Sequence, residues 1–138
     1  EQEMPAMQAL IEFVAQNTRI DRQKIMLTGM SDGATLTLQL GLSQGSPFTH
    51  LAPFSGTLDP ALVETGAVEQ ARDKSIYLVH GSQDWMFPVE VGTMTHQVLE
   101  AYNRHMIYRE IDGLGHAFAR SELTRLLPWF SDALNLES

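Results

Sequence analysis

IMLTGMSDG, residues 25–33, is the stretch of this 138-residue chain that decides the expected fold. Its first four residues form a short apolar run that ends at a glycine, as a buried strand does. Gly29-Met30-Ser31-Asp32-Gly33 then follows the G-x-S-x-G pattern, in which a tight strand-to-helix turn presents a serine hydroxyl and flanking glycines permit close backbone approach. An ordinary glycine-rich turn with a capping serine is the alternative. The strand candidate directly before the turn favours the first interpretation.

Residues 35–40, TLTLQL, follow the turn and fit two kinds of secondary structure. Their alternation of polar and apolar side chains is typical of a half-buried strand. The chemistry of the turn favours a helix instead, because the G-x-S-x-G pattern leads from a strand into a helix. The helix would carry two apolar stripes, one with Ala34, Leu38 and Leu42 and the other with Leu36 and Leu40.

Three further segments are predicted as strands because they are rich in apolar, β-branched or aromatic residues and are bounded by Gly, Pro or Asp. They span residues 50–54, 75–80 and 106–111. Pro88 suits the first turn of a helix between the last two strands. The expected buried stripe of that helix consists of Val91, Met94, Val98, Leu99 and Tyr102. Strands that alternate with helices predict an α/β fold, with a parallel sheet, right-handed crossovers and flanking helices.

Both ends of the chain carry helical spacing. Near the start, a proline suited to a first turn precedes apolar residues at i, i+3, i+4 and i+7, namely Pro5 and then Met7, Leu10, Ile11 and Val14. Near the end, a second stripe consists of Leu123, Leu126, Leu127, Phe130 and Leu134, in a helix that Pro128 is expected to kink or restart. Residues 58–74 are expected to form a loop with a short helix. Because the chain starts inside a helix, we expect residues 1–138 to form a single domain that lacks its N-terminal strands.

The composition excludes several classes of protein. Nine Lys and Arg residues against 17 Asp and Glu give a formal charge of −8, which argues against a basic nucleic-acid binder. Hydrophobic residues make up 43% of the chain, so a packed domain is expected. The sequence has no Cys, which excludes disulfides, zinc-thiolate sites and a thiol nucleophile. No stretch approaches the ~18 apolar residues of a membrane span, and the first residues lack the pattern of a secretion signal. The compartment stays open, with the cytoplasm slightly favoured.

Two more loops at the ends of predicted strands carry side chains suited to catalysis. The loop after the strand at residues 75–80 contains Asp84, which could orient and stabilise an imidazole; its other interpretation is a turn former. The loop after the last strand contains His116, for which a structural role is the alternative. The carboxyl ends of parallel strands share one edge of a sheet, so both side chains are expected near Ser31. The order Ser, Asp, His, each after a separate strand, belongs to one fold in particular.

The remaining histidines are expected to have structural roles, and one other carboxylate is considered as the acid. Asp112 is the rival of Asp84, but it shares a loop with the histidine, where reach and angle are less favourable. His80 is expected to end a buried strand with a hydrogen bond, and His50 to open one. His96 and His105 are expected on a helix.

The chain resembles the C-terminal half of an α/β-hydrolase, and it is most similar to the phospholipase/carboxylesterase and polyhydroxybutyrate-depolymerase-like esterases. The resemblance rests on GMSDG (29–33), LVHGSQDWMFP (78–88) and GLGHAF (113–118), and it covers about residues 19–134. It implies a serine hydrolase that cleaves carboxylic esters or thioesters without a metal or organic cofactor. The roles that it implies are nucleophile for Ser31, acid for Asp84, base for His116, one oxyanion N–H from Asp32, and substrate-pocket positions for Met30, Trp85, Met86 and Phe118.

The resemblance also implies a departure from the family. The first strands, and the loop after the third strand that supplies the other oxyanion N–H, would lie before residue 1. An exposed sheet edge would remain, and such an edge invites a homo-oligomer, a swapped dimer or a separate N-terminal fragment. The alternative function is a non-catalytic module, flavodoxin-like or a degenerate hydrolase, that serves interaction. The expected partner is a small-molecule ester, with neither a nucleic acid nor a membrane span.

Overall fold

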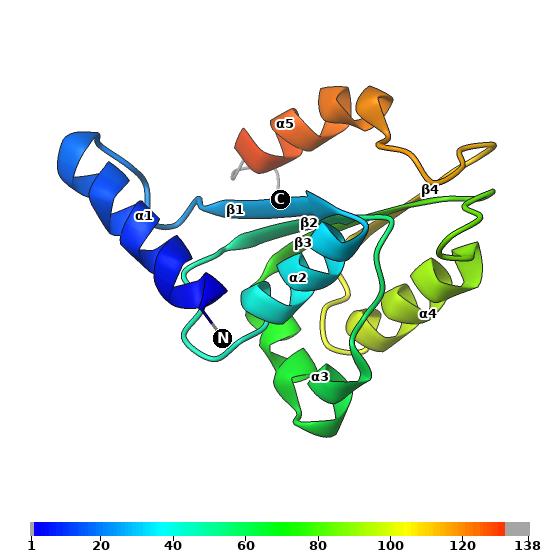
Figure 1. Ribbon diagram of the computed structural model, residues 1–138, viewed down its shortest axis with the longest axis horizontal. Helices are drawn as coiled ribbons and strands as arrows, with labels where there is room; N and C mark the ends of the chain where they lie inside the picture. Colours follow the sequence, from blue (N-terminus) through cyan, green and yellow to red (C-terminus); the bar gives the residue numbers. More distant parts are fainter. Residues whose placement is uncertain (1, 132–138) are drawn as a thin grey trace.

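Four parallel strands form the centre of the computed structural model, which describes residues 2–131 (Figure 1). They are β1 (Met26–Met30), β2 (His50–Phe54), β3 (Ser75–Gly81) and β4 (Ile107–Ile111), and they lie in the sheet in the order β1-β2-β3-β4. Each strand pairs in parallel with the next along the chain. The carboxyl ends of the strands therefore share one edge, and the predicted α/β fold with a parallel sheet and flanking helices is confirmed.

Helices cover both faces of the sheet, and most of them lie on one face (Figure 1). The helical elements are α1 (Glu3–Asn17), α2 (Asp32–Gly41), α3 (Pro60–Glu64), η1 (Ala67–Asp73), α4 (Val89–Glu100), η2 (Arg120–Glu122) and α5 (Leu123–Ser131). The elements α2, α3 and α4 lie on one side of the sheet, and α5 crosses the other side. α1 lies beside β1, at the lateral edge of the sheet.

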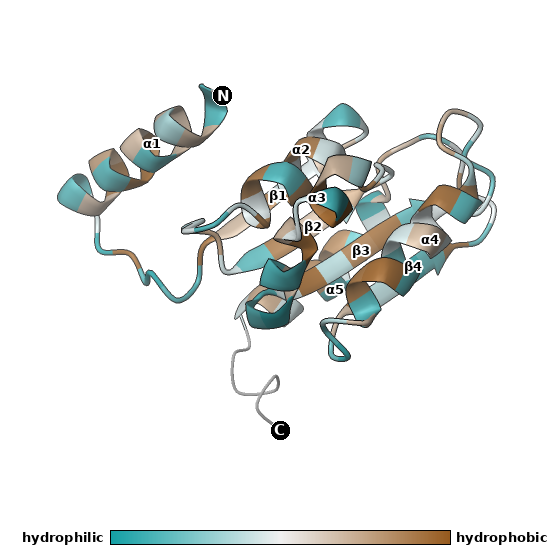
Figure 2. Ribbon diagram, turned by 90° about the horizontal axis from the view of Figure 1, so that it is seen from below, coloured by the Kyte–Doolittle hydropathy of each residue, from teal (hydrophilic) through white to brown (hydrophobic). Residues whose placement is uncertain are grey.

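The strands send alternate side chains to two hydrophobic clusters, one on each face. In β3, Ile76 and Leu78 join the larger cluster under α2, η1 and α4, whereas Tyr77 and Val79 join the smaller one under α5. This period of two follows from the pleat of a strand, and burial on both faces explains why the strand reads as a continuous apolar run. Figure 2 shows hydrophobic residues along β3, and both hydrophilic and hydrophobic residues on the outer surfaces of the helices.

The segment with two possible structures, residues 35–40, is part of α2. The predicted stripe of Ala34, Leu38 and Leu42 is the buried one, with exposed fractions of 0%, 1% and 0%. The Thr37 hydroxyl donates to the Gly33 carbonyl within the helix, so a polar residue at a buried position is satisfied locally. The strand alternative is wrong, because the residues before this segment commit the backbone to a helical turn.

Three predictions about local structure need correction. Residues 58–74 contain two short helical elements, α3 and η1, instead of one. The helix after Pro88 ends at Glu100, so the predicted Tyr102 lies beyond it, and the predicted core residue Met94 is 62% exposed. α4 buries Gly92, Thr95 and Leu99, because a glycine lets the helix approach β3 closely and the sheet-facing stripe is thereby rotated away from the most apolar residues.

Two further predictions concern the C-terminal half. His105 lies in the exposed turn after α4 and not on a helix. α5 continues through Pro128, so the helix is not restarted there. Leu134, the last residue of the predicted stripe, lies outside the described residues.

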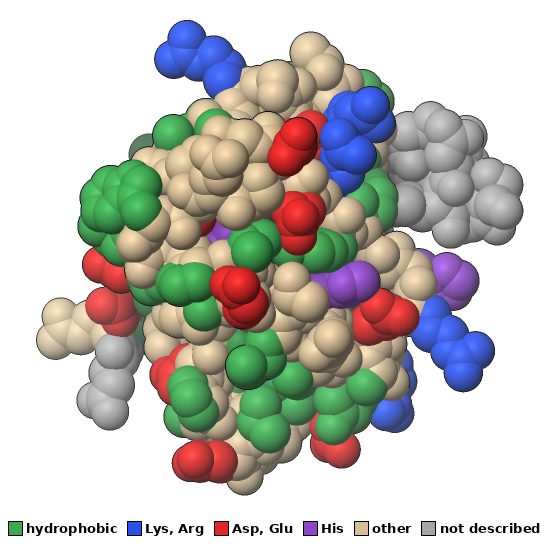
Figure 3. All heavy atoms as spheres, turned by 90° about the vertical axis from the view of Figure 1, so that its right-hand side faces the viewer, with side chains coloured by type: hydrophobic (Ala, Val, Ile, Leu, Met, Phe, Trp, Pro, Cys, Tyr) green, Lys and Arg blue, Asp and Glu red, His purple; other side chains and the backbone are tan. Residues whose placement is uncertain are grey.

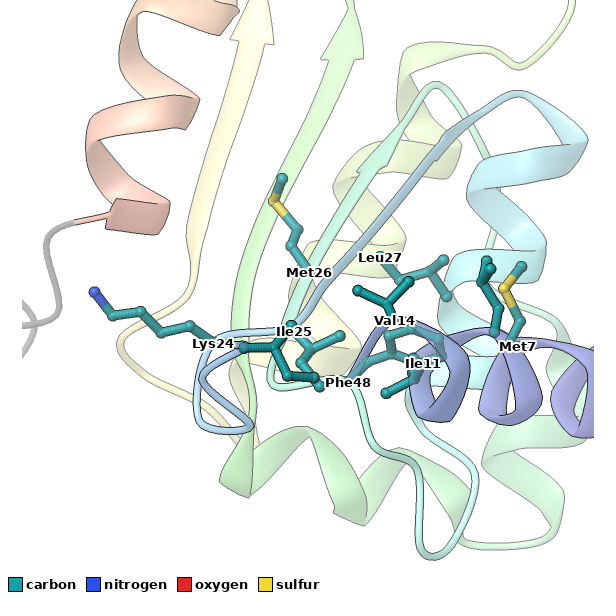
Figure 4. A pocket seen from close by; sticks show the side chains of 10 residues that line it. Met7, Ile11, Val14, Lys24, Ile25, Met26, Leu27 and Phe48 are labelled. Atoms are coloured by element: carbon teal, nitrogen blue, oxygen red, sulfur yellow. The ribbon is translucent and has the colours of Figure 1, made fainter. Parts of the chain in front are cut away.

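An apolar cleft of about 380 Å³ separates α1 from β1 (Figure 4). Met7 and Ile11 of α1 pack against the larger cluster, whereas Leu10 and Phe13 are 59% and 57% exposed. Within the described residues β1 pairs with β2 alone, so its other edge is unpaired. The expectation that a second copy or an N-terminal fragment covers this edge stays a prediction.

A buried carboxylate fixes α5 and η2 to the smaller cluster. Glu122 of η2 accepts hydrogen bonds from the Tyr77 hydroxyl at 2.8 Å and from Arg109 Nε and Nη2 at 2.9 and 3.2 Å. The hydrogen bonds from Arg109 hold the pKa of Glu122 below its ordinary 4.5, although burial raises it. Burial raises the pKa of the Tyr77 hydroxyl to about 12, so it remains a donor.

Replacing Glu122 by Gln tests this anchor. We expect Glu122→Gln to lower the free energy of unfolding at neutral pH by about 1.5–3 kcal/mol, because the charge that Arg109 and Tyr77 bind is lost. The depressed pKa of Glu122 means that its contribution is complete above the ordinary value of 4.5 and disappears as the pH falls through the folded-state value. The difference between the two proteins should therefore shrink on acidification, as measured by urea denaturation, with exposed Glu64→Gln as the neutral control.

Candidate active site

A strained turn at the end of β1 carries Ser31. The backbone angles of Ser31 are φ 60° and ψ −122°, a conformation that residues with a Cβ rarely adopt and that folded proteins retain mainly at functional sites. Its N–H donates to the Phe54 carbonyl at 2.9 Å, and its carbonyl accepts from the N–H groups of Ala34 and Thr35. The turn therefore leads directly from β1 into α2, as the G-x-S-x-G pattern predicts.

The two glycines of the turn are not equivalent. A Cβ on Gly29 would lie 2.4 Å from the carbonyl oxygen of Gly33, far closer than a van der Waals contact permits. A Cβ on Gly33 would meet nothing within 4 Å. The expectation that both glycines permit close approach is thus right for Gly29 and wrong for Gly33, because only the first lies under the opposing backbone.

Asp84 lies in the loop after β3, with no part of its side chain exposed. Its Oδ1 accepts the N–H groups of Met86 at 2.9 Å and Phe87 at 2.8 Å. Burial raises the pKa of the Asp84 carboxyl, but the hydrogen bonds from His116, Phe87 and Met86 outweigh burial and hold that pKa below its ordinary value. The carboxylate is therefore charged at neutral pH although it is buried.

His116 lies between this carboxylate and the serine. Its Nδ1 is 2.9 Å from Asp84 Oδ2 and 3.1 Å from Oδ1, and its Nε2 is 3.1 Å from Ser31 Oγ. A carboxylate only accepts, so the proton of the neutral ring lies on Nδ1 and the lone pair of Nε2 faces the serine hydroxyl. The structure thus brings the three residues predicted from separate loops into one hydrogen-bonded chain.

Backbone hydrogen bonds join the loop of Asp84 to the loop of His116. The N–H of Ser82 donates to Ile111 O and that of Gln83 to Leu114 O, each at 2.9 Å, and Gly113 N–H donates to the Ser82 hydroxyl at 2.8 Å. The rival acid, Asp112, is exposed and accepts a long 3.5 Å hydrogen bond from Ser82. No hydrogen bond joins Asp112 to His116 among the contacts of the described residues, so the geometry favours Asp84.

Two aromatic rings lie beside the histidine, and further apolar side chains lie at the same edge of the sheet. The Trp85 and Phe87 rings lie 5.8 and 5.6 Å from the His116 ring, and Phe118 packs on Phe54 at 4.9 Å. The exposed fractions of the side chains predicted to line the pocket are 73% for Trp85, 50% for Met86 and 42% for Phe118, while Met30 packs on the smaller cluster. Figure 3 faces this edge of the sheet, where hydrophobic and acidic side chains share the surface. Their role in a substrate pocket stays a prediction.

Phe87 of the Asp84 loop and His80 of β3 were not predicted to support the site. Phe87 supplies an N–H to Asp84, and its carbonyl lies 2.7 Å from His80 Nε2. The spacing His80-x-x-x-Asp84 is visible in the sequence, but it does not tell which atoms of the loop face the carboxylate.

Neither a metal site nor a membrane span is found in the part of the chain that the structure describes. No group of three or more His, Asp or Glu residues within 2–131 could hold a metal ion. No helix among these residues is both long and apolar enough to cross a bilayer.

Comparison with known sequences identifies the family. The family described as Phospholipase/Carboxylesterase matches residues 1–132. The chain belongs to the phospholipase/carboxylesterase family of α/β-hydrolases. A curated relative in sequence, acyl-protein thioesterase 1 from Kluyveromyces lactis, is 26% identical over 121 residues, which cover 85% of this chain and 53% of that protein. This member of the phospholipase/carboxylesterase family thus spans about half the length of its curated relative.

Solved structures share the fold of this phospholipase/carboxylesterase chain. SOBER1 from Arabidopsis thaliana matches with a TM-score of 0.75 and 22% identity, over 94% of this chain and 62% of that protein. Esterase PE8 matches with a TM-score of 0.73 and 24% identity, over 95% and 60%. Acyl-protein thioesterase 2 from Zea mays matches with a TM-score of 0.60 and 20% identity, over 79% and 55%.

The unequal glycines of the serine turn give a matched pair of variants. We expect Gly29→Ala to destabilise the protein by at least about 2 kcal/mol, because the added methyl group must displace backbone atoms. Gly33→Ala should change the free energy of unfolding by no more than about 1 kcal/mol, and toward greater stability, because alanine favours the first turn of α2. Chemical denaturation of both variants measures this difference. A more damaging effect of Gly33→Ala would contradict the assignment.

Proposed function

We propose that this chain carries the catalytic residues of a serine hydrolase that cleaves carboxylic esters or thioesters through an acyl-enzyme. The observation that supports this most is the continuous chain from Ser31 Oγ through His116, at 3.1 Å from Nε2, to Asp84, at 2.9 Å from Nδ1. The family of the chain contains esterases and thioesterases, which supports the same reaction class.

The proposed reaction begins with proton transfer. His116 Nε2 takes the Ser31 hydroxyl proton while the serine oxygen attacks the substrate carbonyl. The Asp84 carboxylate holds the ring in the required tautomer and stabilises the imidazolium that forms. His116 then protonates the leaving alcohol or thiol, and water releases the acyl group by the same steps.

The oxyanion that forms on the substrate needs N–H donors. We assign one of them to Asp32, the first residue of α2, because N–H groups at a helix N-terminus precede the intrahelical hydrogen bonds, and here those bonds begin with Ala34. A second donor would come from the part of the domain that the longer relatives have in addition. One such donor is worth about a hundredfold to a thousandfold in rate, so the chain with this part present is the proper enzyme to assay.

The surroundings of His116 favour an apolar acyl or leaving group. Trp85 exposes a large hydrophobic surface 5.8 Å from the imidazole, and Met86 and Phe118 are exposed on the same two loops, so we propose that these three side chains contact the substrate. The curated relative is an acyl-protein thioesterase, which supports a thioester as a substrate beside a simple ester. Asp32 and Asp112 are also exposed near this edge, so a strongly anionic substrate is disfavoured.

A fluorophosphonate probe tests the proposal. We expect the probe to label the wild-type protein at Ser31, because the adjacent His116 removes the hydroxyl proton, and we expect Ser31→Ala to abolish both labelling and hydrolysis of short p-nitrophenyl esters. Asp84→Asn should lower kcat by about 10⁴-fold, because the ring tautomer is no longer fixed. Mass spectrometry of the labelled peptide and spectrophotometric assays provide the measurements.

Ser121→Ala is the control for these assays, because its serine is exposed on η2. If neither this chain nor a longer form that includes the part present in its relatives reacts with the probe or hydrolyses an ester, the alternative of a non-catalytic interaction module is preferred.

A further inference from the structure

His80 is a buried ionisable residue that the proposed reaction does not use. It is the penultimate residue of β3, and its side chain is 0% exposed. Its Nε2 lies 2.7 Å from the carbonyl oxygen of Phe87. A carbonyl oxygen only accepts, so Nε2 carries the proton and donates it. In the neutral ring Nδ1 then has no proton.

The other ring nitrogen shows why this position holds a histidine. Nδ1 of His80 is buried without a hydrogen-bond partner. The backbone of α4 packs directly on the ring, since a Cβ on Gly92 would lie 2.8 Å from Cγ and Nδ1. An apolar side chain would fill the same space and leave no nitrogen unpaired, so packing alone does not favour histidine here. Compared with an apolar side chain of similar size, histidine adds the Nε2–H donor.

The Nε2–H donor reaches the catalytic carboxylate through one residue. Phe87 accepts from His80 with its carbonyl and donates its N–H to Asp84 Oδ1 at 2.8 Å. His80 Nε2 is itself 3.6 Å from Asp84 Oδ2, which is too long for a hydrogen bond. The contacts therefore run from His80 to Phe87, from Phe87 to Asp84, and from Asp84 to His116.

We propose that His80 is a positioning residue that holds the loop of Asp84 closed and so fixes the carboxylate against His116. The proposal rests on the proposed function. Without the bond to His80, the Phe87 carbonyl is no longer held. The backbone torsions of Phe87 can then change, and its N–H, which lies in the preceding peptide group, leaves Asp84. The carboxylate then turns toward other donors, and its bonds to His116 lengthen.

Four variants separate positioning from simple packing. His80→Phe removes the donor and keeps an aromatic ring, whereas His80→Gln restores a side-chain N–H that can reach the Phe87 carbonyl. Gly92→Ala leaves His80 in the sequence but pushes its ring away from its present place. His50→Phe is the matched control, because His50 is also buried with an unpartnered ring nitrogen but lies at the amino end of β2, opposite the site.

The expected result is a loss of kcat with little change in KM. His80→Phe should lower kcat for a p-nitrophenyl ester by about tenfold to a hundredfold and change KM by less than about threefold, because misplaced catalytic groups slow the reaction step. The acidic limb of the kcat/KM profile should move to lower pH, because a displaced Asp84 stabilises the protonated base less. Gly92→Ala should change kcat and the pH profile in the same direction, and His80→Gln should retain kcat within about threefold. His50→Phe should lower stability without either kinetic change.

A ¹H NMR measurement tests the positioning role of His80 independently of enzymatic activity. The proton between His116 Nδ1 and Asp84 should give a far-downfield ¹H NMR resonance, which His80→Phe broadens or shifts and His80→Gln and His50→Phe retain. An unchanged resonance in His80→Phe, or equal losses of kcat in His80→Phe and His50→Phe with a fixed pH profile, would overturn the proposal. A wild-type protein that shows the resonance but takes no fluorophosphonate label would instead overturn the proposed function.

Discussion

A carboxylate that has lost contact with water must be compensated by hydrogen-bond donors, and this requirement of Asp84 organises the carboxyl edge of the sheet. Two donors come from the backbone of its own loop, and the third is the imidazole of His116. The third donor is within reach because β3 and β4 are parallel neighbours whose last residues, Gly81 and Ile111, lie in register. The compensation of one buried charge thus links two loops that are separate in the sequence.

Much of the fold could be predicted because the burial of side chains leaves a clear pattern of apolar residues in the sequence. Strands buried on both faces read as continuous apolar runs, and the limits predicted for residues 50–54 agree with β2. The alternation in residues 35–40 was ambiguous, since Thr37 satisfies its hydroxyl inside a helix as easily as in a strand. Met94 was misplaced because the sequence does not show that α4 packs on β3 through a glycine, which leaves the more apolar stripe outside.

The candidate site, like the fold, could be predicted only in part. Ser31, Asp84 and His116 could be predicted because each follows a strand and parallel strands bring their carboxyl ends together. The residues and backbone groups that support these three side chains could not be predicted. Whether Gly29 or Gly33 faces the opposing backbone, and which peptide group His80 meets, depends on loop conformations that no periodic pattern encodes.

The hydrogen bonds that join Ser82 and Gln83 to the loop of His116 have a mechanical consequence. Asp84 and His116, the proposed acid and base, lie on two loops that are bonded to each other and anchored to β3 and β4, while Ser31, the proposed nucleophile, lies in the bend between β1 and α2. Thermal breathing of the sheet would then leave the imidazole–carboxylate spacing nearly constant and act chiefly on the gap between Ser31 and His116. A distortion of β1 or β2 would therefore affect the proposed reaction by changing the distance between Ser31 and His116.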